Sequence, residues 1–160
     1  MSFFDLFHPS PQMKILAVSS HADSFLVELA DFLSLHNGSM DLSFYPGEHQ
    51  ELSYSSITKI DRLKNFSSLP RSASRDYEAV IIQDVLHLHS LPLKFLQLLY
   101  RSMENSAEII IVQQKGAMKS SDIEALLEQS EFRVPNTIDD LVEGCEVIVG
   151  KKMHMWGNGL

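Results

Sequence analysis

The sequence predicts an α/β fold with a doubly wound, mostly parallel sheet, helices on both faces and an antiparallel final strand. Apolar runs of strand length alternate with segments whose apolar residues recur every three or four positions, as in proteins with a mostly parallel sheet. The runs 79–82 and 109–112 are rich in β-branched residues, as central parallel strands are. The last two predicted strands, 132–134 and 146–150, are joined by a short acidic segment, which fits an antiparallel pair.

The first part of the chain has the order strand, helix, strand within about thirty residues, which is a βαβ unit. Ser20 or Asp23 is the predicted helix cap, and Asn37-Gly38 stops the helix because both residues tolerate the left-handed conformation. The three elements are predicted at residues 13–18, 25–33 and 42–45.

The pattern weakens over 48–76 and returns after it. Ser121, followed three residues later by Glu124, predicts a capping box at the start of the last helix. The remaining elements are a short strand at 57–60, a loop at 65–74, strands at 79–82 and 108–112, and helices over 91–103 and from 120 to before Phe132.

A length of 160 residues predicts one domain that spans 1–160, with an N-terminal apolar segment at 1–12, the core at 13–152 and a tail at 153–160. No internal repeat and no second domain is predicted. Phe3, Phe4 and Phe7 lie ahead of the first strand and form an apolar cluster. Three alternatives stay open for this cluster: a lid, a homodimer contact or part of the core.

The charge balance narrows the classes of partner. Thirteen Lys and Arg against 21 Asp and Glu give a net charge of −8, which argues against a dedicated nucleic-acid or membrane binder. The basic residues concentrate in 59–75 and the acidic residues in 120–146. These blocks are interpreted as solvated faces, with recognition of charged partners as the alternative.

Cysteine usage and the N-terminus predict the compartment. The single Cys145 can form neither an intrachain disulfide nor a thiolate zinc site, which favours a reducing compartment. The first residues have no signal-peptide pattern, and no apolar run is long enough to span a membrane. We therefore expect a soluble, cytoplasmic protein.

Several common nucleotide and hydrolase motifs are missing. The chain contains neither the Gly-x-Gly-x-x-Gly pattern nor the phosphate-binding P-loop pattern, and the Gly-x-Ser-x-Gly elbow of hydrolases is missing around Ser19 and Ser20. A receiver-like or flavodoxin-like domain is a third, weaker hypothesis: Lys115 is present, but the paired acids that a receiver needs after the first strand are not.

The stretch from Asp76 to Pro92 has the most specific pattern. The acidic-aromatic pair Asp76-Tyr77 leads into the apolar strand, and Leu86-His87 precedes a predicted helix. This order resembles the fourth-strand motif of class I S-adenosylmethionine-dependent methyltransferases. Residues 76–152 resemble the family through to its antiparallel seventh strand, whereas 13–75 resemble it in element order only. The resemblance implies a Rossmann-like methyltransferase fold.

The resemblance also implies a cofactor, S-adenosylmethionine, over the loop that follows the first strand. In the family this loop usually carries an acidic residue and two or three glycines, because the backbone must approach the cofactor closely. Here residues 18–23 contain no glycine, so small side chains occupy the positions at which the family's glycines leave space for the cofactor. The positions that correspond to cofactor-binding residues are Ser19, Ser20 and His21 in this loop, Glu48 for the ribose hydroxyls and Asp61 for the adenine.

The implied catalytic residues are His87 and Asp84, just past the end of the fourth strand, where open α/β sheets place their ligands. In some oxygen methyltransferases that the motif resembles, a histidine at this position removes the acceptor proton. The alternatives are a His87 ring that only binds the sheet edge and an Asp84 that caps the next helix. His87 and His89 form a His-x-His pair, but we predict no metal site because no third ligand is evident.

Two functions remain open. One is S-adenosylmethionine-dependent methyl transfer to a small molecule. The other is a non-catalytic binding or assembly module that keeps the methyltransferase fold and has lost the cofactor. The glycine-free loop favours the second, and the pattern at 76–92 favours the first.

Overall fold

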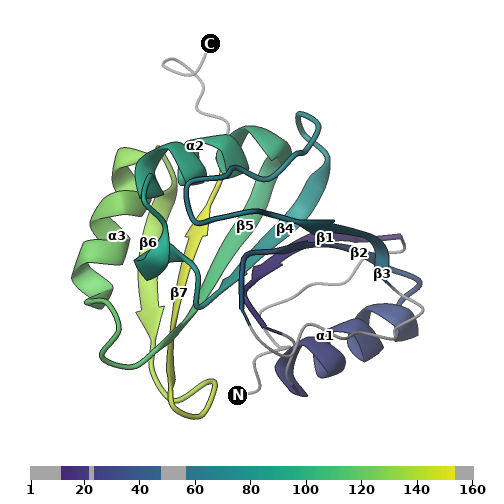
Figure 1. Ribbon diagram of the computed structural model, residues 1–160, viewed down its shortest axis with the longest axis horizontal. Helices are drawn as coiled ribbons and strands as arrows, with labels where there is room; N and C mark the ends of the chain where they lie inside the picture. Colours follow the sequence, from purple (N-terminus) through teal and green to yellow (C-terminus); the bar gives the residue numbers. More distant parts are fainter. Residues whose placement is uncertain (1–11, 22–23, 48–56, 154–160) are drawn as a thin grey trace.

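A computed structural model describes residues 12–21, 24–47 and 57–153, and these residues form one seven-stranded sheet flanked by helices (Figure 1). No helix in these ranges is long and apolar enough to cross a membrane. The strands are β1 (Lys14–Ser19), β2 (Ser39–Phe44), β3 (Ile57–Arg62), β4 (Tyr77–Gln83), β5 (Met103–Gln114), β6 (Arg133–Ile138) and β7 (Cys145–Lys151). The helices are α1 (Ser24–Leu35), the short 3₁₀ helix η2 (Leu86–Leu88), α2 (Pro92–Ser102) and α3 (Ser120–Gln129).

The strand order is β3-β2-β1-β4-β5-β7-β6. Strands β1 to β5 pair in parallel, whereas β7 runs antiparallel to both β5 and β6. The predicted α/β class and its antiparallel ending are therefore confirmed. Because the order reverses between β1 and β4, the carboxyl ends of these two strands mark the switch point at which such sheets place ligands.

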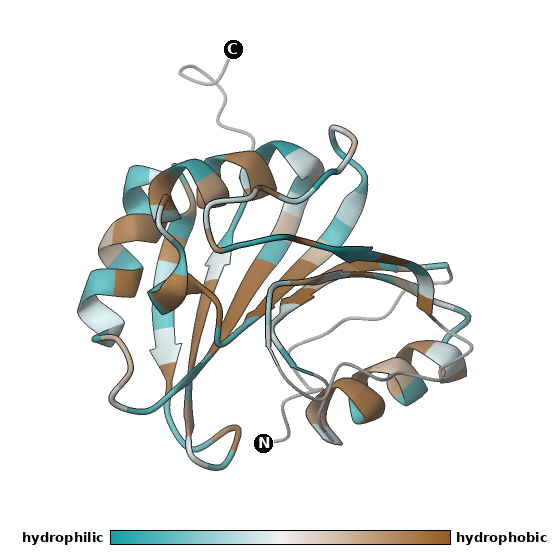
Figure 2. Cartoon of the chain, viewed as in Figure 1, coloured by the Kyte–Doolittle hydropathy of each residue, from teal (hydrophilic) through white to brown (hydrophobic). Residues whose placement is uncertain are grey.

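Helices cover both faces of the sheet (Figure 1). On one face, Phe25, Leu26, Leu29 and Leu33 of α1 pack in a core cluster with apolar residues of the strands. On the other face, α2 and α3 pack against the same strands, and Phe95 and Leu127 are fully buried there. The central strands consist mainly of hydrophobic residues, as Figure 2 shows, because each side of the sheet faces a layer of the core.

The Asp76-Tyr77 pair has a structural role at the amino ends of the strands. The Asp76 carboxylate accepts a 2.7 Å hydrogen bond from Lys14 Nζ, and the Tyr77 hydroxyl donates to Asp41 Oδ2 at 2.7 Å. Lys14 also lies 3.8 Å from Asp41 and over the Tyr77 ring. These contacts join β1, β2 and β4, so we call Lys14, Asp41, Asp76 and Tyr77 the strand clamp.

The start of α3 differs from the predicted capping box. The N-cap position is Lys119, and no side chain caps the helix there. Glu124 instead accepts a hydrogen bond from the Thr137 hydroxyl on β6. The prediction was wrong because a tertiary partner from the neighbouring strand takes the carboxylate that a capping box would use.

Strand β5 begins earlier than predicted and contains a bulge. Between its paired positions Tyr77↔Met103 and Ala79↔Glu108, β5 advances five residues while β4 advances two. Ser106 adopts φ 70° in this bulge, and its amide donates to the Lys152 carbonyl at 2.7 Å. The polar residues at 104–106 hid this part of the strand from a prediction based on apolar runs.

Lys152 follows β7 and holds the carboxyl end of α2. Its side chain is buried, and Nζ donates to the carbonyls of Tyr100 at 2.9 Å and Met103 at 2.7 Å. The ammonium also lies 4.8 Å from the centre of the Tyr100 ring. A cation at this position complements the dipole of α2 at its carboxyl end.

Candidate functional site

The residues that the resemblance assigned to the site come together in part at the carboxyl edge of the sheet. Ser19 and Gln83 are the last residues of the neighbouring strands β1 and β4, and they pair in register. Asp84 follows β4 directly, η2 carries His87, and Gln113 lies near the end of β5. Two networks form here, one around Ser19 and one around Gln113.

The loop after β1 is held by its own side chains. Ser19 is fully buried, and its hydroxyl donates to the His21 carbonyl at 2.7 Å and accepts from the His21 amide at 3.2 Å. The same hydroxyl contacts Gln83 Oε1 at 3.1 Å. Ser20 Oγ lies 3.4 Å from His21 Nδ1. The Ser19 hydroxyl is therefore engaged by the protein and turned into the loop.

The loops after β1 and β2 pack directly against each other. The Tyr45 amide donates to the Ser19 carbonyl at 2.9 Å, which extends the β1–β2 ladder one residue past the end of β2. A Cβ atom added to Gly47 would lie only 2.0 Å from the Ser20 carbonyl oxygen, far inside van der Waals contact. Gly47 is thus needed for close approach of two backbones, and the group that it approaches is the loop after β1.

Asp84, His87 and Gln113 form the second network. Asp84 adopts φ 51°, and its Oδ1 accepts a 2.7 Å hydrogen bond from the Gln114 amide. It therefore binds the end of β5; the N-cap of the following η2 is Val85, so Asp84 does not cap that helix. Gln113 Nε2 lies 2.8 Å from His87 Nδ1 and 3.4 Å from Asp84 Oδ1. Gln113 is fully buried, and its Oε1 has no hydrogen-bond partner among the described residues.

His89 belongs to a different network that the sequence did not indicate. The Leu91 amide donates to its Nδ1 at 2.9 Å, so the neutral ring carries its proton on Nε2, which contacts the Ser68 carbonyl at 3.1 Å. The Tyr45 hydroxyl donates to the same carbonyl and lies 3.1 Å from Nε2. Burial lowers the pKa of His89 and raises the pKa of Tyr45, so both groups are neutral at pH 7.

Aromatic rings pack around this second histidine. His89 stacks on Phe95 with ring centres 4.6 Å apart, and Tyr45 stacks on Phe66 at 5.3 Å. Tyr45 is fully buried and stands directly after β2, near where the family holds the ribose hydroxyls with an acid. The residue pattern at the end of β2 does not indicate that Tyr45 lies in the core. The sequence therefore did not reveal the contact between Tyr45 and His89.

The structure describes only one of the three remaining groups of predicted residues. Glu48, the predicted ribose acid, and the cluster of Phe3, Phe4 and Phe7 lie outside the described residues. Asp61 lies within β3, paired with Ser43, rather than in the loop after it. One of its carboxylate oxygens, Oδ2, is buried and has no hydrogen-bond partner within the described residues.

His87 and His89 do not act as a pair. They flank Leu88 in and after η2 instead of lying on a strand, and their rings bind Gln113 and Ser68 respectively. In the described part of the chain, no three His, Cys, Asp or Glu side chains gather as metal ligands.

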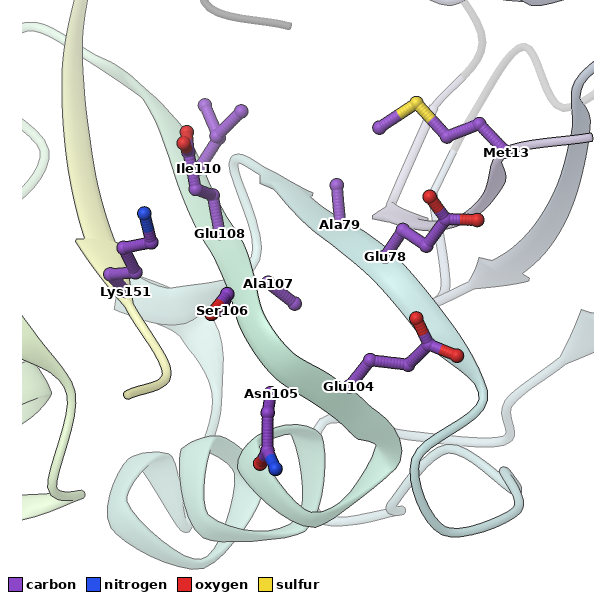
Figure 3. A pocket seen from close by; sticks show the side chains of 10 residues that line it. All are labelled: Met13, Glu78, Ala79, Glu104, Asn105, Ser106, Ala107, Glu108, Ile110 and Lys151. Carbon is purple, nitrogen blue, oxygen red and sulfur yellow. The ribbon is translucent and has the colours of Figure 1, made fainter. Parts of the chain in front are cut away.

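A cavity of about 250 Å³ lies at the opposite, amino edge of β4, beside the bulge of β5 (Figure 3). Its charged lining comes from Glu78, Glu104, Glu108 and Lys151, and its apolar lining includes Met13 and Ile110. None of the residues that the resemblance assigned to cofactor or catalysis lines it.

The strand order and the antiparallel β7 define the class I S-adenosylmethionine-dependent methyltransferase fold, and comparison with solved structures supports this class. No protein-family model and no curated protein matches the sequence. Among solved structures, an S-adenosylmethionine-dependent methyltransferase from Aquifex aeolicus is similar with a TM-score of 0.75 and 16% identity, over 94% of this chain and 87% of that one.

Two further structures are similar over most of this chain. The carbon methyltransferase CurJ gives a TM-score of 0.71 at 10% identity, over 94% of this chain and 51% of that one. The Haloferax volcanii complex between the Trm112 methyltransferase activator and a methyltransferase gives 0.69 at 10% identity, over 91% of this chain and 84% of that one. At these identities the likeness shows the fold alone.

The described residues of the β1 loop do not fit S-adenosylmethionine in the family's manner. The Ser19 hydroxyl is saturated by His21 and Gln83, and the Ser20 carbonyl lies against Gly47. On the β2 side, the backbone of this loop is therefore in contact with the protein's own backbone.

Proposed function

We propose that this chain is a methyltransferase-fold binding module that has lost the S-adenosylmethionine site. The observation that carries the proposal is the contact between the β1 and β2 loops, where Gly47 approaches the Ser20 carbonyl so closely that even a methyl group would not fit. In the family that the sequence resembles, the cofactor lies over the first of these loops. The buried Ser19 hydroxyl and the buried Tyr45 ring support the same conclusion.

Calorimetric titration and thermal unfolding with S-adenosylmethionine and S-adenosylhomocysteine test this proposal. We expect no heat of binding and no rise in melting temperature with either compound. The Aquifex aeolicus methyltransferase serves as the positive control. Saturable binding of either compound to the wild-type chain would overturn the proposal. A Ser19→Gly/Ser20→Gly variant that binds where the wild type does not would identify the loop side chains as the obstacle.

A second candidate is methyl transfer to a small-molecule acceptor. It is favoured by the placement of His87 and Asp84, which lie together with Gln113 at the carboxyl edge of β4 and β5. Transfer of a labelled methyl group to small hydroxyl compounds, lost in His87→Ala, would support this candidate and exclude the first. The cytoplasmic location, the homodimer contact and a small-molecule ligand stay predictions under either candidate.

A further inference from the structure

The network of Asp84, Gln113 and His87 determines which ring nitrogen of His87 carries a proton. Asp84 Oδ1 also accepts from the Gln114 amide, and an ionised carboxylate has only acceptors to offer. The side-chain group of Gln113 that faces it must therefore be the NH₂ group, whose Nε2 lies 3.4 Å away. The reverse orientation would place two acceptor oxygens against each other.

The same NH₂ group lies 2.8 Å from His87 Nδ1. Because Gln113 Nε2 can only donate, Nδ1 must accept and cannot carry a proton. The proton of the neutral imidazole is then on Nε2. We infer that Gln113, oriented by Asp84, is a positioning residue that holds His87 in its Nε2–H tautomer and so makes His87 a hydrogen-bond donor at the carboxyl edge.

This assignment changes the chemistry that His87 offers. A general base needs an unprotonated nitrogen directed at the substrate, and here the unprotonated nitrogen is occupied by Gln113. The remaining nitrogen, Nε2, donates to an acceptor, so the ligand group that His87 would recognise is an oxygen acceptor such as a carboxylate, phosphate or carbonyl. The inference does not depend on whether S-adenosylmethionine binds.

Long-range proton–nitrogen correlation spectra of the full chain with ¹⁵N-labelled histidine test the inference. They are recorded well above pH 6.5, the ordinary imidazole pKa, so that the rings are neutral. His87→Gln identifies the His87 signals. Two other rings provide references: His89 accepts at Nδ1 from the Leu91 amide, and His36 Nδ1 faces the Phe32 carbonyl at 3.0 Å and must donate. We expect His87 to show the pattern of His89.

The matched variants are Gln113→Glu and Gln114→Glu. A carboxylate at 113 accepts where the amide donated, so we expect Nδ1 of His87 to become protonated. Gln114 is exposed, so the same charge one residue later leaves the His87 pattern unchanged. Should Gln113→Glu not fold, Gln113→Met removes the donor at similar volume, and the second tautomer of His87 becomes detectable.

A wild-type His87 protonated on Nδ1 would overturn the inference. So would a folded Gln113→Glu or Gln113→Met protein in which the tautomer of His87 is unchanged. These outcomes are independent of the titrations with S-adenosylmethionine, so failure of the proposed function and failure of this inference are distinguishable.

Discussion

Gly47 is the residue on which the shape of the sheet's carboxyl edge at β1 and β2 depends. Its contact with the Ser20 carbonyl fixes the distance between the loops after β1 and β2. A side chain here cannot be accommodated by rotating a neighbouring side chain, because the opposing atom belongs to the backbone. The residue therefore controls the separation of two loops rather than the conformation of one.

Gly47→Ala is expected to destabilise the protein by about 2–3 kcal/mol, the upper part of the range for overpacking a tightly packed site. The free energy of unfolding in urea measures the effect. Gly116→Ala is the comparison: Gly116 has open space around it but φ +86°, so this variant should lose only about 1 kcal/mol through backbone strain. Equal losses in the two variants would contradict the close packing of the loops.

At the scale of elements, the cation Lys152 links the end of β7 to the end of α2. It donates to the half-buried carbonyl of Tyr100, which also accepts from the Met103 amide, and to the buried carbonyl of Met103. Because Lys152 also donates its amide to the Ala107 carbonyl at 2.9 Å, the same residue fastens the helix and the bulge of β5.

Lys152→Met retains most of the side-chain volume and removes the donors. We expect a loss of about 2–3 kcal/mol in the free energy of unfolding, since hydrogen bonds to a charged group contribute about 1.5–3 kcal/mol. Lys151→Met, at the half-buried neighbouring position, is the matched control and should change stability by less than about 0.5 kcal/mol. Amide exchange localised to the last turn of α2 would identify the helix end as the region that loosens.

The elements themselves could be predicted from the sequence because their apolar periodicity is strong. The runs at 79–82 and 109–112 and the stripe of α1 all correspond to observed elements. Predictions that depended on one polar side chain fared worse. Glu124 binds Thr137 instead of the helix start, and Asp84, for which a helix cap was one open alternative, binds the end of β5. A short polar side chain has several partners within reach, and the tertiary structure selects among them.

The candidate site was predictable in position but not in connectivity. The motif at 76–92 placed His87 and Asp84 at the carboxyl edge, because strand ends meet there in any parallel sheet. Gln113 lies 26 residues from His87, and a glutamine after an apolar run is not a recognisable signal. The network between them arises only when β4 and β5 pair in their observed register.

For the molecule as a whole, the two charged segments lie toward opposite ends of the sheet. The basic block 59–75 begins in the edge strand β3, and the acidic block 120–146 includes the opposite edge strand β6.

The edge strand β6 has features that hinder pairing with other chains: Val134 adopts φ 52°, and Pro135, next to it, lies where the pairing with β7 shifts register. A bulge with a proline discourages edge-to-edge association.

Buried titratable rings should limit stability at both ends of the pH scale. Burial lowers the pKa of His89 in the folded protein. Below about pH 6.5 the unfolded chain therefore binds a proton at this ring more readily than the folded protein does, and the free energy of unfolding falls as the pH decreases. Burial raises the pKa values of Tyr45 and Tyr77, so above about pH 10 the unfolded chain loses protons first and stability falls as the pH rises. Each group contributes at most about 1.4 kcal/mol per pH unit.

Urea unfolding at a series of pH values measures this profile. Tyr77→Phe should flatten the decline of the free energy of unfolding above about pH 10. Tyr100→Phe should flatten it less, because the Tyr100 hydroxyl makes no hydrogen bond among the described residues. His89→Gln should flatten the decline between pH 6.5 and 5 in the same way. An unchanged slope in Tyr77→Phe or His89→Gln would show that other groups govern the response.

The strand clamp has a consequence for the order in which the chain assembles during synthesis. Lys14 and Asp76 are 62 residues apart, and β1 pairs with β4 across a similar distance. Closing a loop of that length costs about 4 kcal/mol of chain entropy before any contact forms. In a nascent chain that has emerged only as far as β3, β1 can therefore pair only with β2. The sheet can extend toward β5 and β7 only after residues 76–83 have emerged and paired with the other side of β1.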